Sequence, residues 1–164
     1  MKAQHWVLVL LLAAIALQSL YYYPQLPDTV ASHFGGAGQP NGWSYKAVFF
    51  WTYLGMVFLM VLVFYGLPVV CRKFPSASLN VPHKEYYLAP ERRAETLAAF
   101  TPRLHWMGNA TVGFQLGVFQ LAIEANLPGQ RGLPLTSFLV LLGAFLAFVG
   151  IWVFRIYRLF PKPR

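Results

Sequence analysis

Charged residues are scarce in this sequence. They make up 11% of its 164 residues, and only five are acidic, whereas a typical soluble domain has about a quarter charged residues. This shortage excludes an ordinary soluble globular protein, a disordered chain and a coiled coil. Cys71 is the one cysteine, which excludes an internal disulfide and a cysteine-based zinc site. With 57% hydrophobic residues and a mean hydropathy of +0.50, the sequence indicates an integral membrane protein.

Four apolar stretches are long enough to cross a membrane, because a helix needs about 20 residues to span a hydrocarbon core of about 30 Å. They are residues 6–23, 47–71, 108–127 and 135–157. The first stretch also resembles a cleaved signal peptide, but its continuation into three tyrosines at 21–23 is typical of a membrane interface and favours a retained span. We therefore expect an all-α integral membrane protein with four transmembrane helices in a single domain, residues 1–164.

The lysines and arginines between these spans predict the orientation. One side of the membrane would carry 11 of them and the other side two. Because positive residues stay in the cytoplasm, both termini are expected inside, with an outer loop at 24–46 and a cytoplasmic connection at 72–107. The net charge of +8 is then explained by topology and lipid headgroups, so no nucleic-acid partner is predicted.

The outer loop is predicted to be structured. Pro27 and Asp28 are typical of a helix start, and the helix would end at Gly35 or Gly36. The run Pro40-Asn41-Gly42 predicts a turn, after which Trp43 reaches the membrane interface.

Several residues of this loop occur in an ordered set: Leu26-Pro27, His33-Phe34, Gly38-x-Pro40-x-Gly42-Trp43 and Lys46. The set resembles the N-terminal domain of unknown function of the sporulation-delaying-protein immunity (SdpI-type) membrane proteins, over about residues 5–65. The run from Asn80 to Arg93 also resembles a segment of single-module relatives, with Tyr87 in place of their tryptophan. The chain lacks the further spans of the immunity protein itself. The resemblance implies a multi-pass protein of the bacterial cytoplasmic membrane, without an established catalytic residue.

Two groups of residues are candidates for an interaction site. The outer loop and the cytoplasmic connection contribute Asp28, His33, Phe34, Gly38, Pro40, Gly42, Trp43, Lys46, Asn80, Pro82, Lys84, Tyr86 and Tyr87. A metal or proton-linked role for His33 is one interpretation, with only Asp28 and Glu124 available to join it. Since zinc ordinarily needs three protein ligands, a histidine that bonds its neighbouring backbone is favoured. No metal, cofactor or catalytic residue is predicted, and lipid or pigment contacts stay open.

The cytoplasmic connection is expected to contain a short interfacial helix. Pro90 and Glu91 are typical of its first turn, and Thr101-Pro102 would separate it from the third span. Tyr86 and Tyr87 are either interfacial aromatics, which is the favoured interpretation, or anchors for a cytoplasmic partner.

The third span carries a polar and glycine-rich stripe. Its members recur at intervals of three or four residues: Asn109, Gly113, Gly117, Gln120 and Glu124. Because polar side chains need partners away from lipid and glycines allow close approach, the stripe is expected to face the bundle or another subunit. We predict that Glu124 bonds a residue of the outer loop, with Lys46 favoured over the mostly uncharged His33. An ion or substrate path along the stripe is the alternative.

Three functions are compatible with these patterns. The first is a non-enzymatic protein-binding module of immunity or signalling type, and the second is an accessory subunit that stabilises a larger membrane complex. The third is a small transporter or enzyme that uses Glu124 and His33. The expected partners are membrane lipids and either other membrane proteins or further copies of the chain.

Overall fold

The computed structural model describes residues 2–71, 73, 81–129 and 132–163. In chain order the elements are α1 (Ala3–Tyr22), the 3-10 helix η1 (Tyr23–Gln25), β1 (Thr29–Phe34), β2 (Pro40–Tyr45), α2 (Lys46–Val61), the π-helix η2 (Leu62–Gly66), α3 (Leu67–Cys71), α4 (Lys84–Tyr87), α5 (Pro90–Glu124) and α6 (Leu135–Tyr157). The protein is thus mostly helical. Within the described residues, three stretches are long and apolar enough to cross a membrane: 3–25, 46–70 and 135–157.

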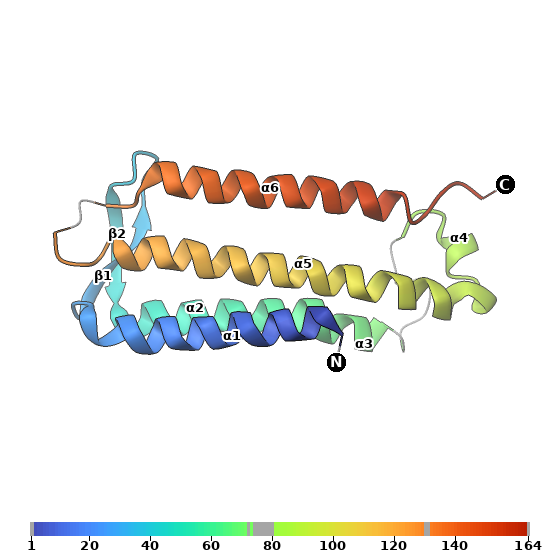
Figure 1. Ribbon diagram of the computed structural model, residues 1–164, viewed down its shortest axis with the longest axis horizontal. Coiled ribbons are helices and arrows are strands. Elements are labelled where there is room, and N and C mark those ends of the chain that lie inside the picture. Colours follow the sequence, from blue (N-terminus) through green and yellow to red (C-terminus); the bar gives the residue numbers. More distant parts are fainter. Residues whose placement is uncertain (1, 72, 74–80, 130–131, 164) are drawn as a thin grey trace.

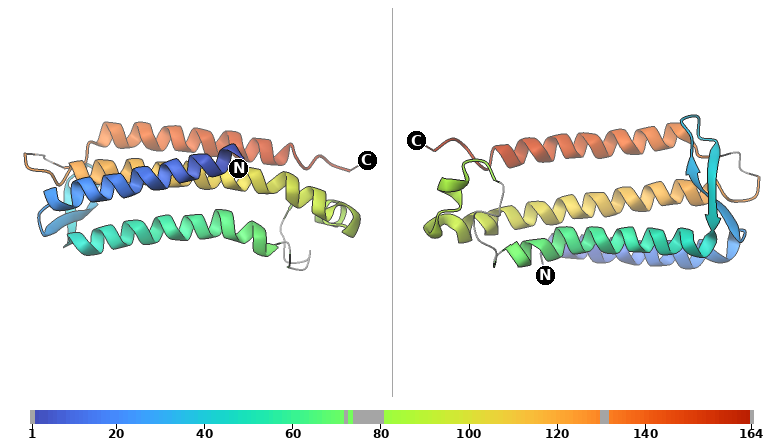
Figure 2. Two further views of the ribbon diagram at one scale, coloured as in Figure 1. Left: turned by 60° about the horizontal axis from the view of Figure 1, so that its bottom comes forward. Right: turned by 180° about the vertical axis from the view of Figure 1, so that it is seen from behind.

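The long helices lie side by side, with α5 in the middle. Helices α1 and α2 lie along one side of α5 and α6 lies along the other (Figure 1). The two strands cover one end of this bundle. Both chain termini point toward the opposite end, which we call the terminal end (Figures 1 and 2).

The central position of α5 follows from its composition. Its buried side chains include Thr96, His105, Asn109 and Gln115, whereas α6 has no buried residue. A polar side chain is costly in contact with hydrocarbon, so the most polar long helix is enclosed by the three apolar ones. The most deeply buried large side chains come from α2, β1 and α5, namely Tyr53, Val30, Val112 and Ile123.

A π-turn interrupts the second long helix where it contacts α5. Residues Leu62–Gly66 of η2 place Phe64 directly against Gly108, where an added Cβ atom would lie 2.6 Å from the Cβ atom of Phe64. A glycine at 108 therefore allows the two backbones to approach closely.

The helix predicted in the loop at residues 24–46 is wrong. Thr29–Phe34 instead forms β1, which pairs antiparallel with β2 across the turn closed by the bond from Gly35 N to Gln39 O at 2.8 Å. A six-residue helix would be too short to nucleate stably, and a hairpin offers the same backbone a strand partner. The predicted turn at Pro40–Gly42 is also wrong, because Pro40 begins β2, a position that strands tolerate. The fold is therefore helical with one β-hairpin rather than all-α.

The predicted break before the third span is wrong as well. Helix α5 continues through Pro102 from Pro90 to Glu124, so residues 90–100 are its first turns rather than a separate interfacial helix. Proline removes one helical hydrogen bond, and side chains beside it bond neighbouring carbonyls. Thr101 Oγ1 donates to Leu97 O at 2.7 Å, and Arg103 Nη1 donates to Ala99 O.

Candidate functional site

The hairpin formed by residues 29–45 has an irregular register. Ala31 pairs with Trp43, His33 with Gly42 and Phe34 with Pro40, so each strand carries an extra residue between paired positions. Such bulges bend a strand and redirect its side chains. A Cβ atom added to Gly42 would lie only 3.1 Å from the Cβ atom of His33, so these two residues pack directly on each other.

Asn126, just after α5, forms the first anchor of the hairpin. Its Oδ1 accepts a hydrogen bond from Ala31 N at 2.6 Å, and its Nδ2 donates to Ala31 O at 2.9 Å. The same Nδ2 donates to Ala122 O at 2.8 Å within α5. The amide side chain thus takes the place of a strand neighbour and joins β1 to α5.

The turn of the hairpin is anchored at Gly38. Its carbonyl accepts a hydrogen bond from Leu133 N at 2.9 Å, and its backbone has φ +78°. An added Cβ atom would lie 2.5 Å from Leu133 O. Both the backbone angle and the close approach therefore require glycine at this position.

Lys46 closes the hairpin at its base. Its Nζ lies 3.0 Å from Asp28 Oδ1 and 3.3 Å from Leu26 O, and its backbone N donates to Asp28 O at 2.8 Å. The Asp28 side chain is 91% exposed, so the ion pair adds little stability and the backbone bond fixes the base.

These anchors leave the aromatic residues of β2 uncovered. Trp43 is 63% exposed and Tyr45 is 72% exposed, and they alternate with the half-buried Ser44, so both lie on the same face of the strand. We call Trp43 and Tyr45 the aromatic face. His33 is also exposed and lies beside Ser32, with Nδ1 3.0 Å from Ser32 Oγ.

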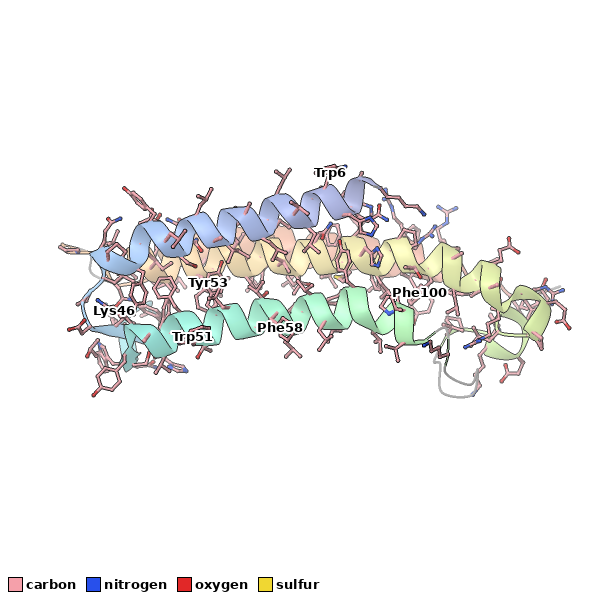
Figure 3. The ribbon with its side chains drawn as sticks, turned by 90° about the horizontal axis from the view of Figure 1, so that it is seen from below. Trp6, Lys46, Trp51, Tyr53, Phe58 and Phe100 are labelled. Carbon is pink, nitrogen blue, oxygen red and sulfur yellow. The ribbon has the colours of Figure 1, made fainter. Side chains whose placement is uncertain are left out.

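A polar network connects α1, α2 and α5 in the half of the bundle near the hairpin. Tyr53 Oη donates to Gln18 Oε1 at 2.9 Å, and Gln18 Nε2 donates to Gln120 Oε1 at 2.8 Å. Gln120 Nε2 then donates to Tyr22 Oη at 3.0 Å and to Glu124 Oε1 at 2.7 Å. Figure 3 shows Tyr53 pointing into the bundle, whereas Trp51 and Phe58 of the same helix point outward.

The predicted bond from Glu124 to the loop is wrong. Among the described residues, the Glu124 carboxylate is bonded to Gln120, while Lys46 pairs with Asp28 and His33 lies beside Ser32. Asn126, two residues after Glu124, makes the connection instead. Its amide both donates and accepts, so it matches both backbone groups of Ala31, which a carboxylate cannot do.

The remaining members of the stripe face two different helices. Asn109 Nδ2 donates to Gln4 O of α1 at 2.9 Å. A Cβ atom at Gly113 would contact Leu11 of α1 at 3.7 Å, whereas one at Gly117 would lie 2.8 Å from Leu141 of α6.

The candidate residues near α4 lie at the terminal end of the bundle. Tyr87 Oη donates to Pro161 O at 2.7 Å, and the Tyr86 ring lies under the Arg92 guanidinium, 4.0 Å from ring centroid to Cζ. Lys84 is exposed and Pro82 is half-buried. Asn80 lies outside the described residues. The structure therefore places this group away from the hairpin (Figure 1).

One cluster was not predicted from the sequence. The rings of Tyr65 and His105 stack 4.2 Å apart, and the His5 ring lies 5.3 Å from that of His105. Tyr65 Oη lies 2.7 Å from Asn109 Oδ1, beside an open pocket of about 550 Å³ lined in part by His5, His105 and Lys2. The two histidines are far apart in sequence, and no motif joins them. The described residues contain no group of three or more His, Cys, Asp or Glu side chains that could hold a metal ion.

The fold and the anchored hairpin define a helical protein with three candidate membrane-spanning helices and a fixed β-hairpin at one end of the bundle. The family model of a domain of unknown function, DUF1648, matches residues 8–64, about a third of the chain. The matched region runs from α1 through the hairpin into η2. No curated protein and no solved structure matches this chain.

Proposed function

We propose that the chain is a non-enzymatic, protein-binding membrane module of immunity or signalling type, with the hairpin as its binding surface. The observation that carries the proposal is the rigid anchoring of the hairpin at Ala31, Gly38 and Lys46 beneath an uncovered aromatic face. Exposed aromatic side chains on a fixed backbone lose little conformational entropy on binding, which is why they dominate many protein interfaces.

The match to DUF1648 supports a relation to the SdpI-type membrane proteins. It covers the hairpin and the two helices that flank it, and therefore the same region in which the ordered proline, His-Phe and Gly-x-Pro-x-Gly-Trp residues occur. A bacterial cytoplasmic membrane is the location that this relation favours.

The proposed topology has four spans, with α5 crossing the membrane in addition to the three apolar helices, and both termini in the cytoplasm. Its support is the central place of α5 and the count of 11 positive residues against two. On intact cells, and with Cys71 replaced, a cysteine at Gln39 should react with an impermeant thiol reagent and one at Lys162 should not. Labelling of Lys162 alone would invert the topology.

The test of the binding surface is a pull-down from native membranes in mild detergent. Trp43→Ala/Tyr45→Ala should lose the membrane protein that co-purifies with the unaltered chain. Phe58→Ala is the matched control, because Phe58 is also exposed, at 69%, but lies on a helix away from the hairpin. Equal capture by all three proteins would refute the role of the hairpin.

A role as an accessory subunit is the second candidate, and the uncovered state of α6 supports it. None of its 23 residues is buried. Another membrane protein packed along α6 would enclose this helix as the others enclose α5. A stoichiometric complex that survives loss of the aromatic face, and is lost on Val140→Asp in α6, would favour this role over the first.

A further inference from the structure

A groove of about 660 Å³ lies between α5 and α6 near the terminal end of the bundle. Its walls include Trp106 of α5 and Phe148, Ile151 and Trp152 of α6. Trp152 Nε1 donates to Arg103 O at 2.8 Å, so a hydrogen bond fixes the two helices to each other at this point. The groove is therefore a feature of a fixed helix pair.

The polarity of the groove changes along its length. Helices α5 and α6 run in opposite directions (Figure 1), so Arg103 of α5 lies toward the same end as Arg155 of α6 and Arg158, which directly follows α6. Phe148 and Arg158 are ten residues apart, which corresponds to about 15 Å along α6. The groove is thus apolar at its deeper end and lined by three guanidinium groups at the terminal end.

Among the described residues, no carboxylate forms an ion pair with these arginines. None of the residues that line the groove is acidic, and the one ion pair among the described residues joins Lys46 to Asp28 at the other end of the bundle. Arg103 Nη1 donates a hydrogen bond to the Ala99 carbonyl. The Arg158 guanidinium lies over the Phe154 ring, 5.5 Å from its centroid. Both side chains are therefore held in place with donors left over, since a guanidinium carries five.

The geometry points to a binding site for an acidic phospholipid in this groove. The phosphate would accept charge-assisted hydrogen bonds from the arginines, a pairing whose planar, two-pronged geometry favours arginine over lysine. One acyl chain would lie along Trp106, Phe148 and Ile151. A free phosphate would leave this apolar wall uncovered, and a protein helix would leave the arginines without anions unless it brought its own carboxylates.

The test uses the full-length chain in detergent micelles, with native mass spectrometry to count retained lipids and a titration to measure affinity. The probes are phosphatidylglycerol as the acidic phospholipid, phosphatidylcholine as a lipid without net charge, and inorganic phosphate. We expect the unaltered chain to retain phosphatidylglycerol in preference to phosphatidylcholine.

Two variants separate the halves of the site. Arg155→Gln/Arg158→Gln should weaken phosphatidylglycerol binding about tenfold or more and leave phosphatidylcholine binding unchanged. Arg92→Gln/Lys162→Gln removes the same charge at the same end but outside the groove, and should bind as the unaltered chain does. Ile151→Trp keeps all three arginines and fills the apolar part, so it should also weaken phosphatidylglycerol binding. Ile151 is 57% exposed, and the fold should tolerate this change.

Three results would overturn the proposal. Equal phosphatidylglycerol affinity in the Arg155/Arg158 and Arg92/Lys162 variants would show that the arginines act only through net charge. Displacement of the lipid by excess inorganic phosphate, with no effect of Ile151→Trp, would define a free-phosphate site. Complete cross-linking of a Phe148→Cys variant, with Cys71 replaced, to a second copy would show that protein occupies the groove.

Discussion

Helices α5 and α6 are neighbours that pack against each other, yet they differ in almost every other respect. Helix α5 carries buried histidine, asparagine and glutamine side chains and contacts α1, α2 and α6. Helix α6 has no buried residue, is apolar apart from Thr136, Ser137 and Arg155, and packs mainly against α5. In a soluble protein the apolar helix would be the buried one. The opposite arrangement here is expected where the surrounding solvent is lipid and polar groups must find partners inside.

The largest loss of stability is expected from a substitution that disrupts the close packing of α5. Gly108→Leu should lower the free energy of unfolding by about 3 kcal/mol, because the added atoms overlap the fixed Cβ atom of Phe64. Gly117→Leu should cost less, since its neighbour is the flexible end of Leu141. Gly143→Leu in α6 is the control, because an added Cβ atom there meets nothing within 4 Å. Denaturation with SDS in mixed micelles measures all three, and equal stabilities would contradict the packing described for α5.

The difference between α5 and α6 also explains what the sequence could predict. Three of the four long helices are recognisable from apolar length alone, and α6 matches its predicted bounds of 135–157. Residues 108–127 were also predicted as an apolar span, but α5, which contains them, is not among the described helices that are long and apolar enough to cross a membrane. Its true length was missed, because Pro102 is a strong helix breaker in sequence terms while neighbouring side chains compensate for it in the structure.

The hairpin could not be predicted from local patterns. Strand β1 lacks clean alternation, since it has two adjacent buried residues, Val30 and Ala31, and each strand carries a bulge. The contacts that stabilise it come from Asn126 and Leu133, about 95 residues later in the chain. The family resemblance marked several loop positions but did not explain why each residue is needed there. The structure explains two of these positions: Gly38 has a backbone with φ > 0, and Gly42 packs against His33.

A second prediction concerns the network of side-chain hydrogen bonds that joins α5 to α1 and α2. Gln120→Leu removes the central link between Gln18, Tyr22 and Glu124 and should cost about 1–2 kcal/mol, the upper range for polar contacts inside membranes. Thr136→Leu on the exposed surface of α6 should change stability little. A loss of stability in the α6 variant as large as in the α5 variant would show that α6 is enclosed by another partner.

A third prediction extends the comparison to Asn126, two residues after the end of α5. Asn126→Ala removes both side-chain bonds to Ala31 and should raise the exchange rate of the Ala31 amide hydrogen about tenfold. The amides in the middle of α5 should keep their rates, because the change is local. Asn41→Ala at the exposed start of β2 is the matched control. Unchanged exchange at Ala31 would mean that the Asn126 anchor is dispensable.

The smallest effect is expected at the base of the hairpin. Asp28→Asn should change stability by no more than about 0.5 kcal/mol, because the carboxylate is exposed and water screens the ion pair with Lys46. Thermal unfolding at low and high salt should show that this small difference disappears as ionic strength rises. A loss above about 2 kcal/mol would mean that the ion pair is shielded by lipid or by another protein.

The length of α5 has a mechanical consequence. Its 35 residues extend about 52 Å, roughly 20 Å more than the thickness of a hydrocarbon core. Asn126 joins one end of this rod to the hairpin, and Thr96 joins the other end to Tyr87 through a hydrogen bond of 2.8 Å. A force applied to the hairpin is therefore transmitted along a single stiff lever to the residues at the terminal end of the bundle. The compliant point of that lever is Pro102, which cannot donate to the carbonyl of Ala98 one turn earlier, so a bend of the rod would concentrate there.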